Sequence, residues 1–425
     1  MIPKRGRRRR GTPIAYDAPP SRSDRLPLLC RALALLLTLL FAWPAAAAGE
    51  PVLIGLDGEF GLTNSTSARS IERGILTAIH EINAKGGVLG GRPLALVTRD
   101  NRSMPARGIK NIEEFAAMPD LVAVFGGRFS PVVLEEMEVL RRTRTLFLAP
   151  WSSADAIVAN GMSPNFVFRL SLRDSLAMPT MLRHAHAKGV EQVGLLLTNT
   201  AWGRSNMAAA QGHFEAGGGP RLAAVAWYNW RDRSLVDKYL SLIDAGARAV
   251  VLVANDDEAA VLVREVAALP RERRVPIISH WGVTGGDFVG QAGKALAEVD
   301  FSVIQTFSLY RADPAIRDRV LAVAGRLFGM DRIEDVEAPV GFAHAYDLTH
   351  ILARAIDLAG GTDRALVRDA LEQVGAHRGL VKRYPRPFTP DRHEALNADD
   401  LLMARYDSRG VLVPLPDGGL VGEGR

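Results

Sequence analysis

Residues 52–98 read VLIGLDGEFGLTNSTSARSIERGILTAIHEINAKGGVLGGRPLALVT. The unbroken apolar run at residues 52–56 predicts a buried strand. Residues 67–83 predict an amphipathic helix, whose apolar face consists of Ile71, Ile75, Ile79 and Ile82. Gly86-Gly87 gives that helix a C-terminal stop, and residues 94–98 predict a second strand. A strand, a helix and a strand of these lengths predict a parallel βαβ unit.

The same alternation continues to residue 148 and starts again at residue 193. The first series has helices at 106–117 and 132–140 and strands at 121–125 and 145–148. The second series has strands at 193–197, 222–227, 249–253 and 276–279 and helices at 206–215, 235–245 and 258–267. Two later helices are predicted at 340–359 and 363–374. The pattern predicts two doubly wound α/β lobes, and it leaves open whether they are independent domains or a clamp that closes on a ligand.

The first 48 residues predict an export leader. A basic segment from Lys4 to Arg10 precedes a short apolar stretch at 33–42, and the small residues 45–48 form an A-x-A-type cleavage site. The apolar stretch is shorter than the roughly 20 residues that span a bilayer. An uncleaved anchor and a twin-arginine signal are the alternatives, and the true start codon can lie downstream.

The leader also accounts for the basic charge of the chain. The formal charge is +5, but residues 1–48 hold nine basic and two acidic side chains. The remainder carries 43 basic and 45 acidic side chains, so it is close to neutral. A nucleic-acid partner normally needs a basic face, and we expect none here. The single cysteine, Cys30, lies in the leader, which excludes disulfides and thiolate chemistry from the mature chain.

Motifs of catalysis and metal binding are weak. The chain has neither a G-x-S-x-G elbow nor a P-loop lysine motif, and the glycines at 86–91 follow a helix, where they make a turn. His184 and His186 are two residues apart and point to different sides of a helix, so solvated or core-edge histidines are favoured over a metal site. The acids at 256–258 are expected at a helix N-terminus, which the helix dipole favours. No cofactor is expected.

Three loops follow predicted strands of the first series. They begin with Asp57-Gly58-Glu59-Phe60-Gly61, Gly126-Gly127-Arg128-Phe129-Ser130-Pro131 and Ala149-Pro150-Trp151-Ser152-Ser153. Ligands of doubly wound sheets bind beyond the carboxyl ends of the strands, where these loops open onto one edge. Ser130 before Pro131 predicts a helix N-cap, and free N–H groups there suit a carboxylate. A tryptophan beside two serines combines an apolar wall with hydrogen-bonding groups, as small-molecule sites do.

These segments resemble the branched-chain amino-acid (Leu/Ile/Val) binding proteins, which are periplasmic binding proteins of type I. The most specific match is E-I-N-A-x-G-G-x-x-G-G at 81–91. Weaker matches are Phe166-Val167-Phe168-Arg169, Ala201-Trp202-Gly203-Arg204 and Ala345-Tyr346-Asp347. The resemblance covers roughly residues 51–415.

The resemblance implies two Rossmann-like lobes joined by a three-strand hinge, as in a Venus flytrap. The N-terminal lobe is then expected at 49–172 plus about 311–395. The C-terminal lobe is expected at 173–310 plus about 396–416. A flexible tail is expected at 417–425, and the signal peptide at 1–48.

It also implies ligand-binding residues. Ser130, Trp151, Ser152 and Ser153 match positions that hold the carboxylate of the ligand, and Trp202 matches an aromatic residue that covers it. Asn255 and Trp281 match further positions on the C-terminal lobe. Residues 279–286 lack the acidic partner of an ammonium group that the family has there, so Glu59, Asp174 or Asp57 is expected to supply the charge, or the ligand lacks an ammonium. Phe60 lies beside Glu59 in the first loop.

The function expected from the resemblance is the capture of an amino acid or a related small carboxylate or amide in the periplasm. The partner would be the membrane permease of an ABC importer. A sensor that feeds a signalling receptor is one alternative. A hydrolase that uses Ser152 or Ser153 is a second alternative, but none of the three loops contains a histidine that could act as its base.

Overall fold

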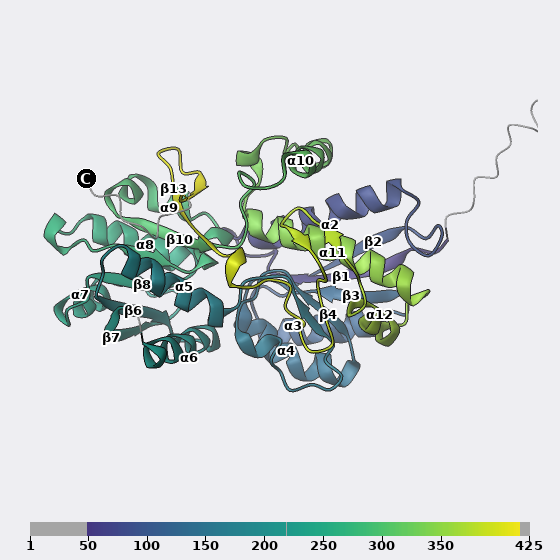
Figure 1. Cartoon of the computed structure of the whole chain (residues 1–425), viewed down its shortest axis with the longest axis horizontal. Coiled ribbons are helices and arrows are strands. Elements are labelled where there is room, and N and C mark those ends of the chain that lie inside the picture. The colour runs from purple at the N-terminus through teal and green to yellow at the C-terminus, as the bar shows by residue number, and fades with distance from the viewer. Residues whose placement is uncertain (1–48, 218, 417–425) are drawn as a thin grey trace, which may run out of the picture. The chain divides into compact units, whose positions relative to one another are not determined.

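The apolar runs of the chain form two β-sheets in the computed structural model, which describes residues 49–217 and 219–416. Figure 1 shows one sheet at the right, with β1, β3 and β4, and the other at the left, with β6, β8 and β10. The predicted signal peptide and the predicted tail lie outside the described residues. Within the described residues, no helix has the length and hydropathy needed to cross a membrane.

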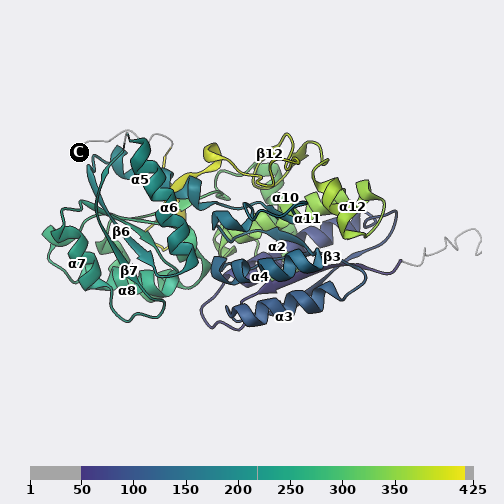
Figure 2. The same ribbon diagram turned by 90° about the horizontal axis from the view of Figure 1, so that it is seen from below.

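The first sheet is parallel throughout, in the order β2-β1-β3-β4-β5. Its strands are β1 (Val52–Gly58), β2 (Leu94–Asp100), β3 (Leu121–Phe125), β4 (Leu146–Ala149) and β5 (Val167–Arg169). Helices α3 (Pro105–Ala116) and α4 (Ser130–Thr143) cover one face, and α2 (Ser67–Ala84) covers the other (Figure 2). Each face has its own core, because Leu121 and Val124 pack with Ile112 of α3 while Val122 and Phe125 pack with Ile71 of α2.

The glycine-rich segment after α2 forms a turn that requires glycine at two positions. Gly86 and Gly87 have φ of +103° and +76°, and a side chain on Gly87 would lie 2.2 Å from the carbonyl oxygen of Arg92. The Asn83 amide donates to the carbonyl oxygen of Leu94 at 2.9 Å and accepts from its N–H at 2.8 Å. The helix therefore ends in a tight turn that is bonded to the start of β2.

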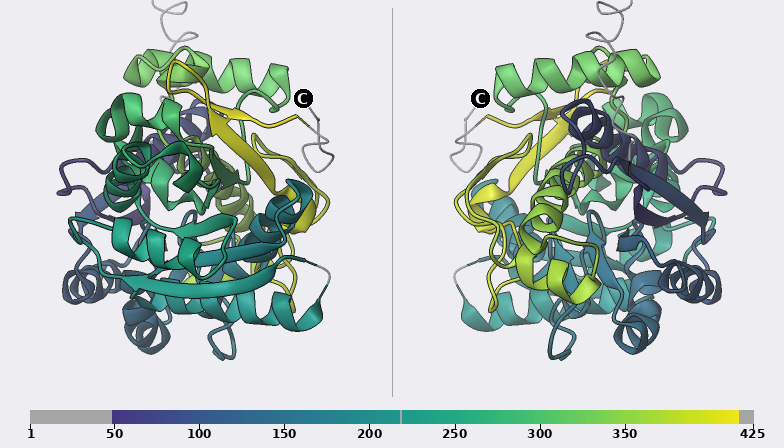
Figure 3. Two further views of the ribbon diagram at one scale, coloured as in Figure 1. Left: turned by 90° about the vertical axis from the view of Figure 1, so that its left-hand side faces the viewer. Right: turned by 90° about the vertical axis from the view of Figure 1, so that its right-hand side faces the viewer.

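The second sheet has the order β14-β13-β10-β9-β8-β6-β7. Its strands are β6 (Gln192–Thr198), β7 (Arg221–Tyr228), β8 (Ala249–Val253), β9 (Ile277–Ser279), β10 (Phe301–Gln305), β13 (Leu402–Tyr406) and β14 (Leu412–Pro414). Strands β13 and β14 are antiparallel to their neighbours, and the others are parallel. Figure 3 shows the yellow end of the chain lying along this sheet. The helices of the sheet are α5 (Asp174–Ala187), α6 (Ala201–Ala216), α7 (Val236–Asp244), α8 (Asp256–Ala267) and α9 (Phe288–Ala292).

The chain passes between the two sheets three times, after β5, after β10 and before β13. Between the last two passages, α10 (Pro314–Phe328) and α11 (Pro339–Ala359) pack against α2, and α12 (Arg364–Leu371) packs on β3 and β4. We call β1–β5 with α2–α4 and α10–α12 the N-lobe, and β6–β10, β13 and β14 with α5–α9 the C-lobe. The two predicted α/β lobes are confirmed, and their boundaries by residue number stay predictions.

Candidate ligand-binding site between the lobes

Two loops of the N-lobe are joined by the buried carboxylate of Glu59. Its Oε1 accepts hydrogen bonds from the hydroxyls of Ser65, at 3.2 Å, and Ser67. Its Oε2 accepts from the backbone N–H of Arg128 at 3.3 Å. A side chain on Gly127 would lie 2.6 Å from this oxygen, so glycine is required where the second loop passes. Glu59 therefore acts as a brace between the loops after β1 and β3.

The three predicted serines hold the loops together. Ser130 Oγ accepts from the N–H groups of Ser153 and Ala154, at 3.1 and 3.2 Å. Ser152 Oγ donates to the carbonyl oxygen of Gly127 at 2.7 Å. Ser130 is the first residue of α4 and its side chain makes no capping hydrogen bond, so its predicted role as the N-cap is wrong. Its hydroxyl instead fixes the loop after β4.

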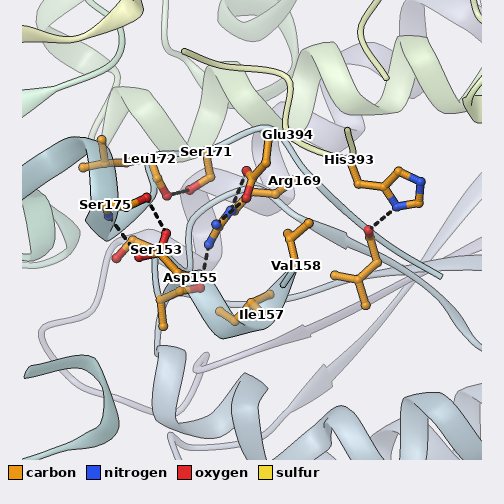
Figure 4. A network of polar contacts seen from close by, with 12 residues as sticks. Ser153, Asp155, Ile157, Val158, Arg169, Ser171, Leu172, Ser175, His393 and Glu394 are labelled. Carbon is orange, nitrogen blue, oxygen red and sulfur yellow. Dashed lines mark hydrogen bonds and ion pairs between the residues drawn. The ribbon is translucent and has the colours of Figure 1, made fainter. Parts of the chain in front are cut away.

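A buried arginine, Arg169, holds the same loop in place (Figure 4). Its guanidinium donates to the carbonyl oxygens of Ser152 and Ala154, at 3.2 and 2.8 Å. It also pairs with Glu394, which lies on the segment where the chain passes between the lobes for the third time. Burial alone lowers the pKa of Arg169, but the neighbouring carboxylates, Glu394 first, raise it. The loop after β4 is thus anchored, through Arg169, to the third passage of the chain between the lobes.

On the C-lobe, Asp174 at the start of α5 fixes the side chains around the site by hydrogen bonds. Its Oδ1 accepts from Trp202 Nε1 and from His280 Nε2, both at 3.2 Å. His280 Nδ1 accepts from the backbone N–H of Trp281 at 3.0 Å, so the ring proton is on Nε2 and is donated to Asp174. Asp174 thereby fixes Trp202 directly, and it fixes Trp281 through His280.

A small cavity lies where these parts of the two lobes meet. It is lined by Arg128, Phe129, Ser130, Pro131, Trp151, Ser153, Trp202, Trp230, Asn255, Trp281 and Gly282. Trp151 and Trp281 face each other across the lobes with ring centroids 5.4 Å apart, and Phe129 and Trp230 do so at 5.4 Å. The volume is about 10 Å³, room for about one water molecule. A larger ligand therefore requires the lobes to separate or side chains to move.

One buried ion pair joins the two lobes beside this cavity. Arg128 donates to Asp256 at 2.9 Å, and the two side chains are 5% and 4% exposed. The guanidinium carbon also lies 4.5 Å from the centroid of Phe129. Burial raises the pKa of Asp256, while the charge of Arg128 opposes this rise. Asp256 begins α8, as expected for an acid at a helix N-terminus. The N-lobe thus presents a guanidinium whose counter-ion is supplied by the C-lobe.

Six of the ten predicted site residues line the cavity: Ser130, Trp151, Ser153, Trp202, Asn255 and Trp281. The other four, Glu59, Phe60, Ser152 and Asp174, lie outside its lining. Asp57, the further acidic candidate, is buried and accepts from the side-chain amides of Asn101 and Asn111, at 2.7 and 2.6 Å.

Sequence reasoning missed Arg128, Phe129 and Trp230 as lining residues. Arg128 and Phe129 stand inside a loop that the sequence singles out, whereas Trp230 follows a strand of the C-lobe without any motif. In the part of the chain that the structure describes, no group of three or more histidines, cysteines or acids is placed to hold a metal ion.

Comparison with known proteins gives a family. Residues 51–410 match the model of a family described as periplasmic binding protein. Leu/Ile/Val-binding protein homolog 1 of Brucella abortus (strain 2308) is 24% identical over 338 residues, which are 79% of this chain and 86% of that protein.

Solved structures share the fold at lower identity. Periplasmic binding protein type 1 from Bordetella pertussis Tohama I has a TM-score of 0.76 and 20% identity, covering 86% of this chain and 100% of its own. A solute-binding protein of an ABC transporter from R. palustris, in complex with 4-hydroxybenzoate, has a TM-score of 0.73 and 15% identity, covering 86% and 96%. The family match spans most of the chain, and both lobes have the architecture of these structures, so the chain belongs to the periplasmic binding proteins.

Proposed function

We propose that this protein captures a small carboxylate between its lobes in the periplasm and delivers it to the permease of an ABC importer. The observation that carries the proposal is the cavity itself. Loops of the N-lobe and helix starts of the C-lobe, far apart in sequence, bring aromatic rings, hydroxyls, an amide and a guanidinium to one place. Such a mixture of apolar walls and few polar groups is typical of small-molecule sites.

The chemistry of the walls favours an aromatic carboxylate over a branched-chain amino acid. Among the described residues that line the cavity, Arg128 is the only one with a charged side chain. A guanidinium suits a carboxylate, and the tryptophans suit a flat ring. The ammonium of an amino acid needs an acidic partner, but Asp174 accepts from Trp202 and His280 outside the lining, and Asp256 pairs with Arg128. The R. palustris protein, whose complex contains 4-hydroxybenzoate, gives this choice a precedent within the fold.

Capture then proceeds by exchange of ion pairs. When the lobes separate, Arg128 leaves Asp256 and its guanidinium faces the crevice from the N-lobe. The carboxylate of the ligand takes the place of the Asp256 carboxylate, and the ring enters between Trp151 and Trp281. Because the ligand contacts both lobes, it shifts the equilibrium toward the closed arrangement.

Isothermal titration calorimetry of residues 49–425 tests the ligand class. We expect benzoate and 4-hydroxybenzoate to bind, and benzamide, which has the same shape without the charge, to bind at least about ten-fold more weakly. The double variant Arg128→Gln/Asp256→Asn avoids an unpaired buried charge and should weaken the acids by about 10- to 100-fold. Arg142→Gln, at an exposed site, is the matched control and should change nothing. Binding of leucine without binding of either acid would contradict the aromatic assignment.

Export and delivery require the leader and a membrane partner. The basic segment, the apolar stretch and the small residues of 1–48 support export with cleavage of this leader. Cell fractionation with mass spectrometry should find the chain in the periplasm with a new N-terminus near residue 49. Uptake of labelled 4-hydroxybenzoate should fall when the gene is deleted. Uptake that is unchanged, together with an altered transcriptional response, would favour the sensor.

A further inference from the structure

A second cavity, of about 500 Å³, lies beyond the carboxyl end of β10. Its walls come from both lobes, with Thr66 and Ala338 on one side and Phe288 and Tyr406 on the other. The short helix at Trp281–Gly285 separates it from the candidate ligand site, because Gly282 lines the small cavity whereas Thr284 lines the large one. The volume is in the range of small-molecule sites.

One buried polar group in this cavity lacks a partner. Gln305, the last residue of β10, is 1% exposed and lines the cavity. Its Nε2 donates to the carbonyl oxygen of Ile304 at 2.7 Å, which fixes the orientation of the amide. Its Oε1 accepts no hydrogen bond from any residue in 49–217 or 219–416. A buried acceptor without a donor is unfavourable, so a ligand donor is favoured there.

The remaining walls are mainly apolar. They include Phe288, Phe307, Leu309, Val336, Leu402 and Leu412. The charged residues on the lining have partners within the chain: Arg409 pairs with Asp407, and Glu334 with Arg332. Asp287 accepts from the N–H of Gly290, and Glu337 lies 3.8 Å from Arg73. Each charged side chain on the lining that the structure describes thus has a polar partner within the chain.

We propose that this cavity is a second binding site, for an uncharged, largely aromatic molecule that carries one N–H or O–H donor. The donor bonds Gln305 Oε1, and the rings pack between Phe288, Leu402 and Val336. Since the walls belong to both lobes, occupation of this site favours the closed arrangement and is coupled to capture at the first site.

The fluorescent probe N-phenyl-1-naphthylamine has these properties, and its N-methyl derivative lacks the donor. We expect the parent probe to bind residues 49–425 with enhanced fluorescence, and more tightly than the derivative by about 3- to 10-fold. Gln305→Met removes the acceptor at similar volume and should abolish this difference. Leu402→Trp fills the cavity and should prevent binding of both probes, whereas Val225→Trp, on a half-buried strand position elsewhere, should not.

Binding at the first site is distinguished by Leu402→Trp, because Leu402 lines only the second cavity, and by benzoate, which should not displace the parent probe. Thermal unfolding of each variant checks that it is folded. The proposal is overturned if the parent probe does not bind, if Gln305→Met and Leu402→Trp leave its affinity unchanged in folded protein, or if benzoate displaces it competitively.

Discussion

Two buried carboxylates beside the candidate site have different partners. Asp174 accepts from the neutral N–H groups of Trp202 and His280, which fixes the position of two aromatic walls. Asp256 instead pairs with a charged group, Arg128, which belongs to the other lobe. The first arrangement has no reason to change when the lobes move, whereas the second must break. Asp174 is therefore a positioning residue, and Asp256 is part of the closing contact.

The buried carboxyl of Glu81 makes the free energy of unfolding depend on pH. Burial would raise the pKa of this carboxyl, but His350 at 3.4 Å, Tyr346 at 2.7 Å and Arg319 at 3.2 Å lower it to about 2. In the unfolded chain the carboxyl titrates near 4.5. The lowered pKa therefore contributes stability that is fully present above about pH 5 and is lost as the pH falls toward 2. Glu81→Gln should reduce the free energy of unfolding by roughly 1–3 kcal/mol at pH 7 and by little near pH 2.

Urea denaturation across this pH range measures the effect. Glu135→Gln, on an exposed face of α4, is the control and should follow the native protein at every pH. A difference between Glu81→Gln and the native protein that stays constant from pH 7 to pH 2 would contradict the assigned pKa.

The sequence predicted many of the residues around the site but not their tasks. The loops after β1, β3 and β4 are visible as residues that follow apolar runs, so Ser130, Trp151 and Ser153 are found. That Ser152 bonds a carbonyl within its own lobe is invisible, since it depends on where a loop 25 positions away passes. The contact of Asp174 with His280 joins residues 106 positions apart. Such pairings follow from the passage of the chain between lobes, which no local pattern encodes.

The turn after α2 gives a second prediction. Gly87 has φ +76° and its added side chain would meet the Arg92 carbonyl at 2.2 Å, so Gly87→Ala both strains the backbone and breaks the turn. We expect a loss of about 2–4 kcal/mol in the free energy of unfolding. Gly361→Ala is the matched control, since nothing lies within 4 Å of the added atom, and should cost less than about 1 kcal/mol. Equal losses for the two variants, measured in urea, would contradict this account of the motif.

Continuous apolar runs such as β3 and β8 were predicted, whereas β10 and α10 were among the elements that were missed. Strands β3 and β8 have the predicted bounds, because five consecutive apolar residues are buried on both faces. The sequence analysis places His184 and His186 on a helix but predicts no bounds for α5, since Pro179 and the two histidines interrupt its apolar pattern. Strands β13 and β14 are short and only half-buried, and their antiparallel pairing at the edge of a parallel sheet is decided by the third passage of the chain. Tertiary context decides such elements.

Several hydrogen bonds and an ion pair join the two lobes directly; for example, Asp155 of the N-lobe accepts from the hydroxyl of Ser175 in the C-lobe at 2.8 Å. Arg128 pairs with Asp256, and Thr66 N–H donates to the carbonyl oxygen of Gly285 at 3.0 Å. Asn64 Nδ2 donates to Asp257 at 3.4 Å. The ion pair is the most deeply buried of these polar contacts, and separation of the lobes exposes both of its members to water.

This pair gives a third prediction, tested by a double-mutant cycle in urea. Arg128→Gln alone leaves Asp256 buried without a counter-ion and should cost about 3–5 kcal/mol, whereas Arg128→Gln/Asp256→Asn should cost much less. The double variant should also show a larger radius of gyration in small-angle X-ray scattering, because the closed arrangement has lost a contact. Additive losses, or a radius of gyration that does not change, would contradict a closing role for the pair.

Under the function proposed above, in which Arg128 holds the carboxylate of the ligand, the Arg128–Asp256 pair also sets the concentration range in which the protein responds. Asp256 is a tethered competitor of any ligand carboxylate, and tethering gives it an effective concentration on the order of millimolar or more. The apparent dissociation constant of the ligand equals the intrinsic one divided by the fraction of molecules in which Arg128 is free of Asp256. The protein thus carries its own inhibitor at the binding group, and capture begins only when the external acid is abundant or offers ring contacts that the aspartate lacks.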